Sequence, residues 1–226
     1  MYSIDKKILT MLIAALVISI VLAGCTGTNG DSGSNSNAAA DKGDVSNGPK
    51  TSSDKKVHYE NGEFTSIDAS SILITSIGQS ADVSMLDAIM KNVPVEYTLD
   101  KLADADDVKD YRTIIISAGA SSKGLGAAGI SAEDELSRAK KIIEVVNQDD
   151  SKEVILVHLG GQARRGTLSD GFIEVLLEIA DYMIVVEEGN DDGIFSNYAA
   201  ENNIPIALAF NISDALTPLQ ELFGQK

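Results

Sequence analysis

Val154-Ile-Leu-Val-His-Leu159 decides the fold, because it places apolar residues at consecutive positions and so on both faces of a strand. A strand of this kind belongs in a parallel sheet that helices cover on both sides. Short runs rich in Ile and Val recur along the chain, and most of them are also apolar on both faces. We predict strands at Ile72 to Ile77, Val95 to Leu99, Thr113 to Ser117, Val154 to Leu159, Tyr182 to Val186 and Ile204 to Phe210.

Helical patterns separate these runs. One helix face carries Leu136, Ala139, Ile142, Ile143 and Val146, and Ser131 with Asp134 forms a capping pair in front of it. Ser169 is expected to cap a second helix, which carries Phe172, Ile173, Leu176, Leu177 and Ile179. Strands that alternate with helices imply right-handed crossovers. We therefore predict an α/β fold with three αβα layers and a doubly wound, mostly parallel sheet of flavodoxin-like or Rossmann-like topology.

The connection from Asp100 to Arg112 is polar and acidic and has room for at most a short helix. This favours the strand order 2-1-3-4-5, with the sixth strand at an edge. In such sheets a ligand binds beyond the carboxyl ends of the strands, where the order reverses. The loops after the first, third and fourth predicted strands are therefore the place to look for a site.

These loops are rich in glycine, hydroxyl and cationic residues. The first precedes a helix expected around Ala81 to Met90, so its amides lie where an anion is favoured. Lys123, Arg164 and Arg165 are expected to converge on one rim and to bind a carboxylate or phosphate. The candidate ligand-binding residues are Ser76, Gly78, Gln79, Ser80, Ser121, Ser122, Lys123, Gly124, His158, Gly160, Gly161, Arg164, Arg165, Glu187 and Glu188.

Each of these features also has a purely structural interpretation. Glycines after strands mark tight turns, and the two arginines can pair with surface carboxylates of this acidic chain. His158 can be a packed, hydrogen-bonded imidazole. The acidic stretch from Glu187 to Asp192 does not have the spacing of the twelve-residue calcium loop, so no metal is expected there. Glu187 or Glu188 could instead receive the amine of a zwitterionic ligand.

The N-terminus has the features of an export signal. Lys6 and Lys7 precede the apolar stretch from Ile8 to Val21, and Ala23-Gly24 precedes Cys25, the single cysteine of the 226 residues. The segment resembles a bacterial lipoprotein signal, which implies cleavage before Cys25 and acylation of its thiol. The alternative is an uncleaved membrane anchor. We expect a signal peptide over residues 1–24, a Gly-, Ser- and Asn-rich disordered tether over 25–65 and a single α/β domain over 66–226.

The composition excludes several functions. The formal net charge of −16 disfavours nucleic acid as a partner. An acylated Cys25 leaves no thiol for catalysis, and the chain has no Gly-x-Ser-x-Gly elbow. Response-regulator receivers need acidic residues where this chain has Thr75-Ser76. The first loop loosely resembles a flavodoxin phosphate loop, but it departs from it at Gln79 and the chain has no Trp, so we expect neither FMN nor another cofactor.

Several stretches of sequence in these loops resemble an uncharacterised bacterial family known only as a domain of unknown function. They are Ser76-Ile-Gly-Gln-Ser-Ala-Asp82, Ser121-Ser-Lys-Gly-Leu-Gly-Ala-Ala-Gly129, Gly160-Gly-Gln-Ala-Arg-Arg-Gly166 with Leu168-Ser-Asp170, and Val185-Val-Glu-Glu-Gly189. The resemblance covers residues 72 to 223. It implies no activity and no functional residue.

Three functions follow as hypotheses. The first is an extracytoplasmic lipoprotein, anchored to the cell membrane through Cys25, that binds a small anionic or zwitterionic solute and serves a transporter or sensor. The second is an extracytoplasmic hydrolase or transferase that uses Lys123 and His158. The third is a structural or protein-interaction module without a pocket.

Overall fold

A seven-stranded sheet lies at the centre of residues 56–224, the part of the chain that the computed structural model describes. The predicted signal peptide, Cys25 and most of the predicted tether lie outside these residues. The sheet has the order β1-β7-β6-β5-β4-β2-β3, and only β1 runs antiparallel to its neighbour. Its strands are β1 (Val57–Glu60), β2 (Ile72–Ile77), β3 (Thr98–Leu99), β4 (Thr113–Ala118), β5 (Glu153–His158), β6 (Tyr182–Val186) and β7 (Ile206–Ala209).

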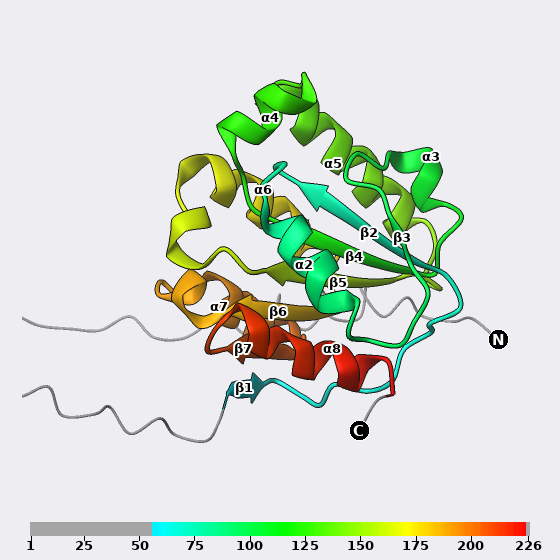
Figure 1. Ribbon diagram of the computed structural model, residues 1–226, viewed down its shortest axis with the longest axis vertical. Helices are drawn as coiled ribbons and strands as arrows, with labels where there is room; N and C mark the ends of the chain where they lie inside the picture. Colours follow the sequence, from blue (N-terminus) through cyan, green and yellow to red (C-terminus); the bar gives the residue numbers. More distant parts are fainter. Residues whose placement is uncertain (1–55, 225–226) are drawn as a thin grey trace, which may run out of the picture. The chain divides into compact units, whose positions relative to one another are not determined.

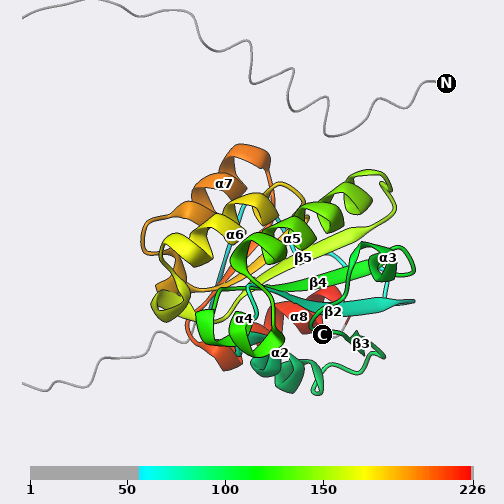
Figure 2. The same cartoon turned by 90° about the horizontal axis from the view of Figure 1, so that it is seen from above.

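Helices cover both faces of this sheet (Figures 1 and 2). One face packs against α5 (Ala132–Asn147), α6 (Thr167–Leu177) and α7 (Ile194–Asn202), and the other against α2 (Asp82–Met90) and α8 (Leu216–Leu222). The remaining elements are α3 (Ala105–Val108), α4 (Ser122–Ala128) and the 3-10 turns η1 (Gly161–Arg164), η2 (Glu187–Asn190) and η3 (Ile212–Ala215). The prediction of a three-layer, doubly wound α/β fold of flavodoxin-like or Rossmann-like type is confirmed.

The predicted strand order is also confirmed, because β3-β2-β4-β5-β6 is the order 2-1-3-4-5. The second strand is shorter than predicted and begins at Thr98 rather than Val95. The hydroxyl of Tyr97 donates to the Asp87 carboxylate at 2.8 Å, so the chain before Thr98 follows α2 instead of the sheet edge.

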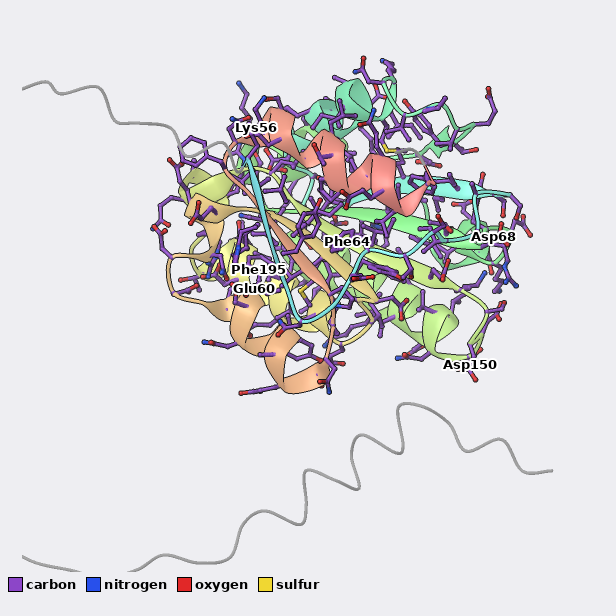
Figure 3. The ribbon with its side chains drawn as sticks, turned by 90° about the horizontal axis from the view of Figure 1, so that it is seen from below. Lys56, Glu60, Phe64, Asp68, Asp150 and Phe195 are labelled. Carbon is purple, nitrogen blue, oxygen red and sulfur yellow. The ribbon has the colours of Figure 1, made fainter. Side chains whose placement is uncertain are left out.

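The prediction that the sixth strand forms an edge is wrong. Strand β1 pairs with β7 in antiparallel register, from Val57 opposite Ala209 to Glu60 opposite Ile206. Figure 3 shows β1 between Lys56 and Glu60, followed by a segment that turns back past Phe64 to Asp68. The sheet therefore starts within the segment predicted as tether.

Aromatic rings fasten this segment to the sheet. The Phe64 ring lies 5.4 Å from that of Tyr59 in an edge-to-face contact and 5.4 Å from that of Tyr182. The Thr65 hydroxyl lies 2.9 Å from the Tyr182 hydroxyl. Pairs of this geometry stabilise a fold by about 0.5 to 1.5 kcal/mol beyond the area they bury.

The helix caps were predicted with mixed success. Ser131 and Asp134 form the expected capping box of α5. Ser169 does not cap α6, because the helix already begins at Thr167 after Gly166. Inside α6 the Ser169 hydroxyl instead accepts a hydrogen bond of 2.9 Å from the backbone N–H of Ala120 and ties α6 to the end of β4.

Removal of β1 tests its contribution. A chain of residues 66–226 should unfold at lower urea concentration than a chain of residues 53–226, with a loss of about 2 kcal/mol, because Tyr59 and Phe64 leave the sheet and the β7 edge is exposed. Urea unfolding followed by circular dichroism measures the difference. Equal midpoints and slopes for the two chains would show that β1 contributes nothing to the fold.

Candidate functional site

An ion pair on α5, between the buried Glu135 and the partly buried Arg138, holds the loop after β2. The Glu135 carboxylate has no exposed side-chain surface and accepts from the Arg138 Nε at 2.8 Å, the backbone N–H of Gly78 at 2.7 Å and the Gln79 side-chain amide at 3.1 Å. Arg138 also donates to the carbonyl oxygens of Ser76 and Ala103. Burial by itself raises the pKa of Glu135, but the hydrogen bonds and charge of Arg138 outweigh it and the pKa is lowered.

This network requires an unusual backbone. Gly78 and Gln79 have φ values of 97° and 54°, and a Cβ on Gly78 would lie 2.5 Å from the Gly119 carbonyl oxygen. Gln79 forms an isolated bridge with Ala120, which joins the loops after β2 and β4. Gly78 and Gln79 therefore hold the loops after β2 and β4 together.

The serines of the first loop lie inside the protein. Ser76 stands opposite Ser117 in the register of β2 and β4, and within the described residues neither hydroxyl has a hydrogen-bond partner. The Ser80 hydroxyl accepts from the backbone N–H of Asp82 at 3.3 Å. Both Ser76 and Ser80 are buried.

The segment after β4 was predicted as a loop, but most of it is helical. Residues Ser122–Ala128 form α4, whose N-cap Ser121 accepts from the Gly124 N–H at 3.0 Å. Gly124 packs so closely on the loop after β2 that a Cβ would lie 1.8 Å from the Gln79 carbonyl oxygen. Ser122 and Lys123 are exposed on the first turn of α4.

Arg165 is held by carboxylates, as the structural interpretation supposed. It donates to Asp170 at 2.7 Å, to Asp192 at 2.8 Å and to the Gly189 carbonyl, and its side chain is only 8% exposed. The bond to Asp192 raises the pKa of Arg165 and lowers the pKa of Asp192 to about 2. The acidic stretch after β6 thus supplies a partner for Arg165, and residues 56–224 contain no group of acidic, His or Cys side chains suited to a metal ion.

Arg164 has a partner that the sequence reasoning missed. Its Nε lies 3.4 Å from Oδ1 of Asp82, the first residue of α2, whose side chain is 1% exposed. A Cβ on Gly160 would lie 2.5 Å from Asp82 Oδ2 and 1.9 Å from Arg164 Cγ. Gly160 is therefore needed where β5, α2 and η1 meet. The sequence did contain a signal for Asp82, because acidic residues are favoured in the first turn of a helix and Asp82 begins the predicted one.

His158 is a packed imidazole, which was the structural alternative. Its ring is fully buried 5.3 Å from that of Phe195, with Nδ1 at 2.9 Å from the Ala118 carbonyl oxygen and Nε2 at 3.3 Å from that of Gly161. Gly189 lies against the ring, since a Cβ there would come within 2.5 Å of it. Burial lowers the pKa of His158.

An open cavity of about 350 Å³ lies at the carboxyl ends of β5, β6 and β7. We call it the polar cavity after Glu188, Asn211 and Ser213, although most of its lining surface is apolar. Its lining residues are Leu159, Gly160, Gly161, Val186, Glu188, Phe210, Asn211, Ile212 and Ser213. A Cβ on Gly161 would lie 3.4 Å from a Glu188 carboxylate oxygen, and Arg164 packs against Gly160. A carboxylate oxygen of Glu188 thus lies beside Gly161, and the aliphatic stem of Arg164 packs against Gly160. Arg164 is not part of the cavity lining, and its buried Nε faces Asp82.

The structure places three of the predicted site residues in the lining of the polar cavity and the others outside it. Gly160, Gly161 and Glu188 line the polar cavity, with Arg164 beside it. Of the others, Gly78, Gln79 and Gly124 hold the loops after β2 and β4 together, and Ser121 caps α4. Ser76, Ser80 and His158 are buried, and Arg165 is 8% exposed. Ser122, Lys123 and Glu187 are exposed outside the lining. The sequence reasoning missed the contribution from the end of β7, where Phe210 to Ser213 complete the cavity.

The fold and the cavity define a doubly wound α/β domain with an open site at the carboxyl edge of its sheet. A family model described as a domain of unknown function (DUF6305) matches residues 69–223, so the chain belongs to this family. No curated protein matches the chain. None of the helices in residues 56–224 is long and apolar enough to cross a membrane.

The buried His158 predicts how stability depends on pH. Because burial lowers its pKa, the unfolded chain binds the proton first, so stability is complete above about pH 6.5 and is lost as the pH falls toward the folded pKa. Urea midpoints between pH 7.5 and 5 should show this loss, with a limiting slope of about 1.4 kcal/mol per pH unit.

Two variants distinguish the contribution of His158 to the pH dependence from that of His58. His158→Gln should flatten the dependence, whereas His58→Gln should retain it, since the His58 side chain is 66% exposed. Should His158→Gln fail to fold, the His58→Gln profile alone is informative. A flat profile in that variant contradicts the assignment to His158.

Proposed function

We propose that this chain is a binding module for a small zwitterionic or anionic solute. The observation that carries the proposal is the polar cavity, which Glu188 lines together with Gly160 and Gly161 and beside which the stem of Arg164 packs against Gly160. A cavity of about 350 Å³ is within the range of small-ligand sites. It differs from the predicted site in position, because it opens beyond β5, β6 and β7 rather than at the reversal of strand order between β2 and β4.

The two charges favour a zwitterion among these solutes. Glu188 offers a carboxylate to an ammonium group, and Arg164 offers a guanidinium that can receive a carboxylate or phosphate. Asp82 is the one ion-pair partner of Arg164 in residues 56–224, and it engages the Nε edge. A solute with both charges would pair its ammonium with Glu188 and its acidic group with Arg164, whose charge Asp82 already balances in part.

The enzyme hypothesis receives less support. Its proposed base, His158, is fully buried and both ring nitrogens face backbone carbonyl oxygens. A general base must reach the proton it removes, within hydrogen-bond distance or through one water. Lys123 stands on the exposed face of α4 and does not line the polar cavity.

Substitutions at the flanking charges test the binding function. Glu188→Gln and Arg164→Gln should each weaken binding of glycine betaine or a free amino acid at least tenfold by isothermal titration calorimetry, because each removes one charge-assisted contact. Gly160→Ala should do the same by displacing Arg164, which a Cβ would meet at 1.9 Å.

Matched controls use residues outside the cavity lining. Glu187→Gln removes a negative charge from the exposed position next to Glu188, and Lys123→Ala removes a positive charge from the exposed first turn of α4. Gly126→Ala adds a methyl group where nothing lies within 4 Å. These three should bind like the parent chain. If no amino acid, betaine, carboxylate or phosphate binds the parent, the proposed function is wrong.

The second part of the proposal concerns location. Lys6 and Lys7, the apolar stretch that follows and the single Cys25 support export and acylation, which would anchor the domain to the extracytoplasmic face of the cell membrane. Such a position suits a solute-binding accessory of a membrane transporter or sensor.

Metabolic labelling tests the anchor. The parent chain should incorporate radiolabelled palmitate and sediment with membranes, whereas Cys25→Ser should lose the label completely because the chain has no other thiol. Label that persists in Cys25→Ser argues against this anchor. The control is Thr26→Ala, a substitution next to the cysteine that should keep the label.

A further inference from the structure

A second cavity adjoins the polar cavity and is almost entirely apolar. It has a volume of about 390 Å³ and lies between α2 and the η3–α8 segment. We call it the apolar cavity, and its lining residues are Met85, Ala88, Ile89, Asn92, Ile212, Ser213 and Leu216. The lining contains no charged residue.

The two cavities are neighbours because Ile212 and Ser213 line both of them. Phe210 also lines the polar cavity. It is 69% exposed, more than any other large hydrophobic residue in the described part of the chain. The exposed ring offers apolar contact area to a ligand in the polar cavity. One ligand can therefore extend from Glu188, past Phe210, to the groove beside α2.

The charges in the two cavity linings indicate which chemical group of such a ligand binds at each end. Glu188 is the one charged residue in the combined lining, and the exposed ring of Phe210 lies in the same cavity. A carboxylate and an aromatic face together suit a quaternary ammonium group. The apolar cavity offers no partner for a charge, so only an apolar group can fill it favourably.

We propose that the solute is a zwitterionic amphiphile, with its charged head in the polar cavity and a single alkyl chain in the apolar cavity beside α2. The combined site has the size of a small-ligand site rather than of a protein interface. This inference rests on the proposed function and adds the tail and its location.

A chain-length series tests the tail separately from the head. N-alkyl betaines from methyl to decyl, kept below the concentration at which they form micelles, are titrated calorimetrically into the full chain carrying Cys25→Ser, so that no detergent is present. Each buried methylene should raise affinity about fourfold until the apolar cavity is filled.

Two variants test whether the alkyl chain binds in the apolar cavity and the charged head in the polar cavity. Ala88→Glu places a charge at an exposed position of α2 in the apolar cavity, so it should flatten the dependence on chain length and leave the methyl compound unchanged. Glu188→Gln should lower affinity by the same factor at every length. Leu168→Glu, at an exposed apolar residue outside both linings, is the control and should alter neither.

The outcomes distinguish this inference from the proposed function. Equal affinity across the series overturns the tail and leaves the binding function standing, and so does an unchanged slope in Ala88→Glu. If decyl sulfate binds as tightly as decyl betaine, the zwitterionic head is wrong. Absence of binding by every betaine, including the methyl compound, overturns the amphiphile proposal, and the panel of amino acids and anions then decides the binding function by itself.

Discussion

The buried pair of Glu135 and Arg138 is the interaction on which the carboxyl edge of the sheet depends. It lies on α5, yet it binds the backbone of Gly78 and the carbonyl oxygens of Ser76 and Ala103, so one helix holds the end of β2 and the approach to α3. Loss of one partner of such a pair typically costs about 3 to 5 kcal/mol, because the other charge stays buried. The positive φ of Gly78 and Gln79 is kept by this network.

This construction leaves little room for a ligand where the strand order reverses. Gly78 and Gly124 bring the loops after β2 and β4 into contact, and the bridge between Gln79 and Ala120 closes them. The open surface lies further along the same edge, beyond β5, β6 and β7, where η3 and α2 leave two adjoining cavities. General expectations for doubly wound sheets identify the correct edge but not the position along it.

Sequence reasoning succeeded where the signal was local. Strands such as β5 (Glu153–His158) are buried on both faces, and the capping box of Ser131 and Asp134 spans only a few residues, so a short stretch of sequence was enough to predict each of them. It failed where a short segment gains its structure from a distant one. Strand β1 has only Val57 to Glu60, and it forms because β7 offers an unpaired edge.

The apolar pattern of the chain was sufficient to establish the layers of the fold and the order of most strands, because burial acts on every residue of a strand or helix face. The amino-acid types at the carboxyl edge were also evident. The partners of the charges were not, since Arg165 meets Asp192 and Arg164 meets Asp82 only after the strands between them are assembled. Which carboxylate each arginine meets depends on distances between separate elements, and no local pattern encodes those distances.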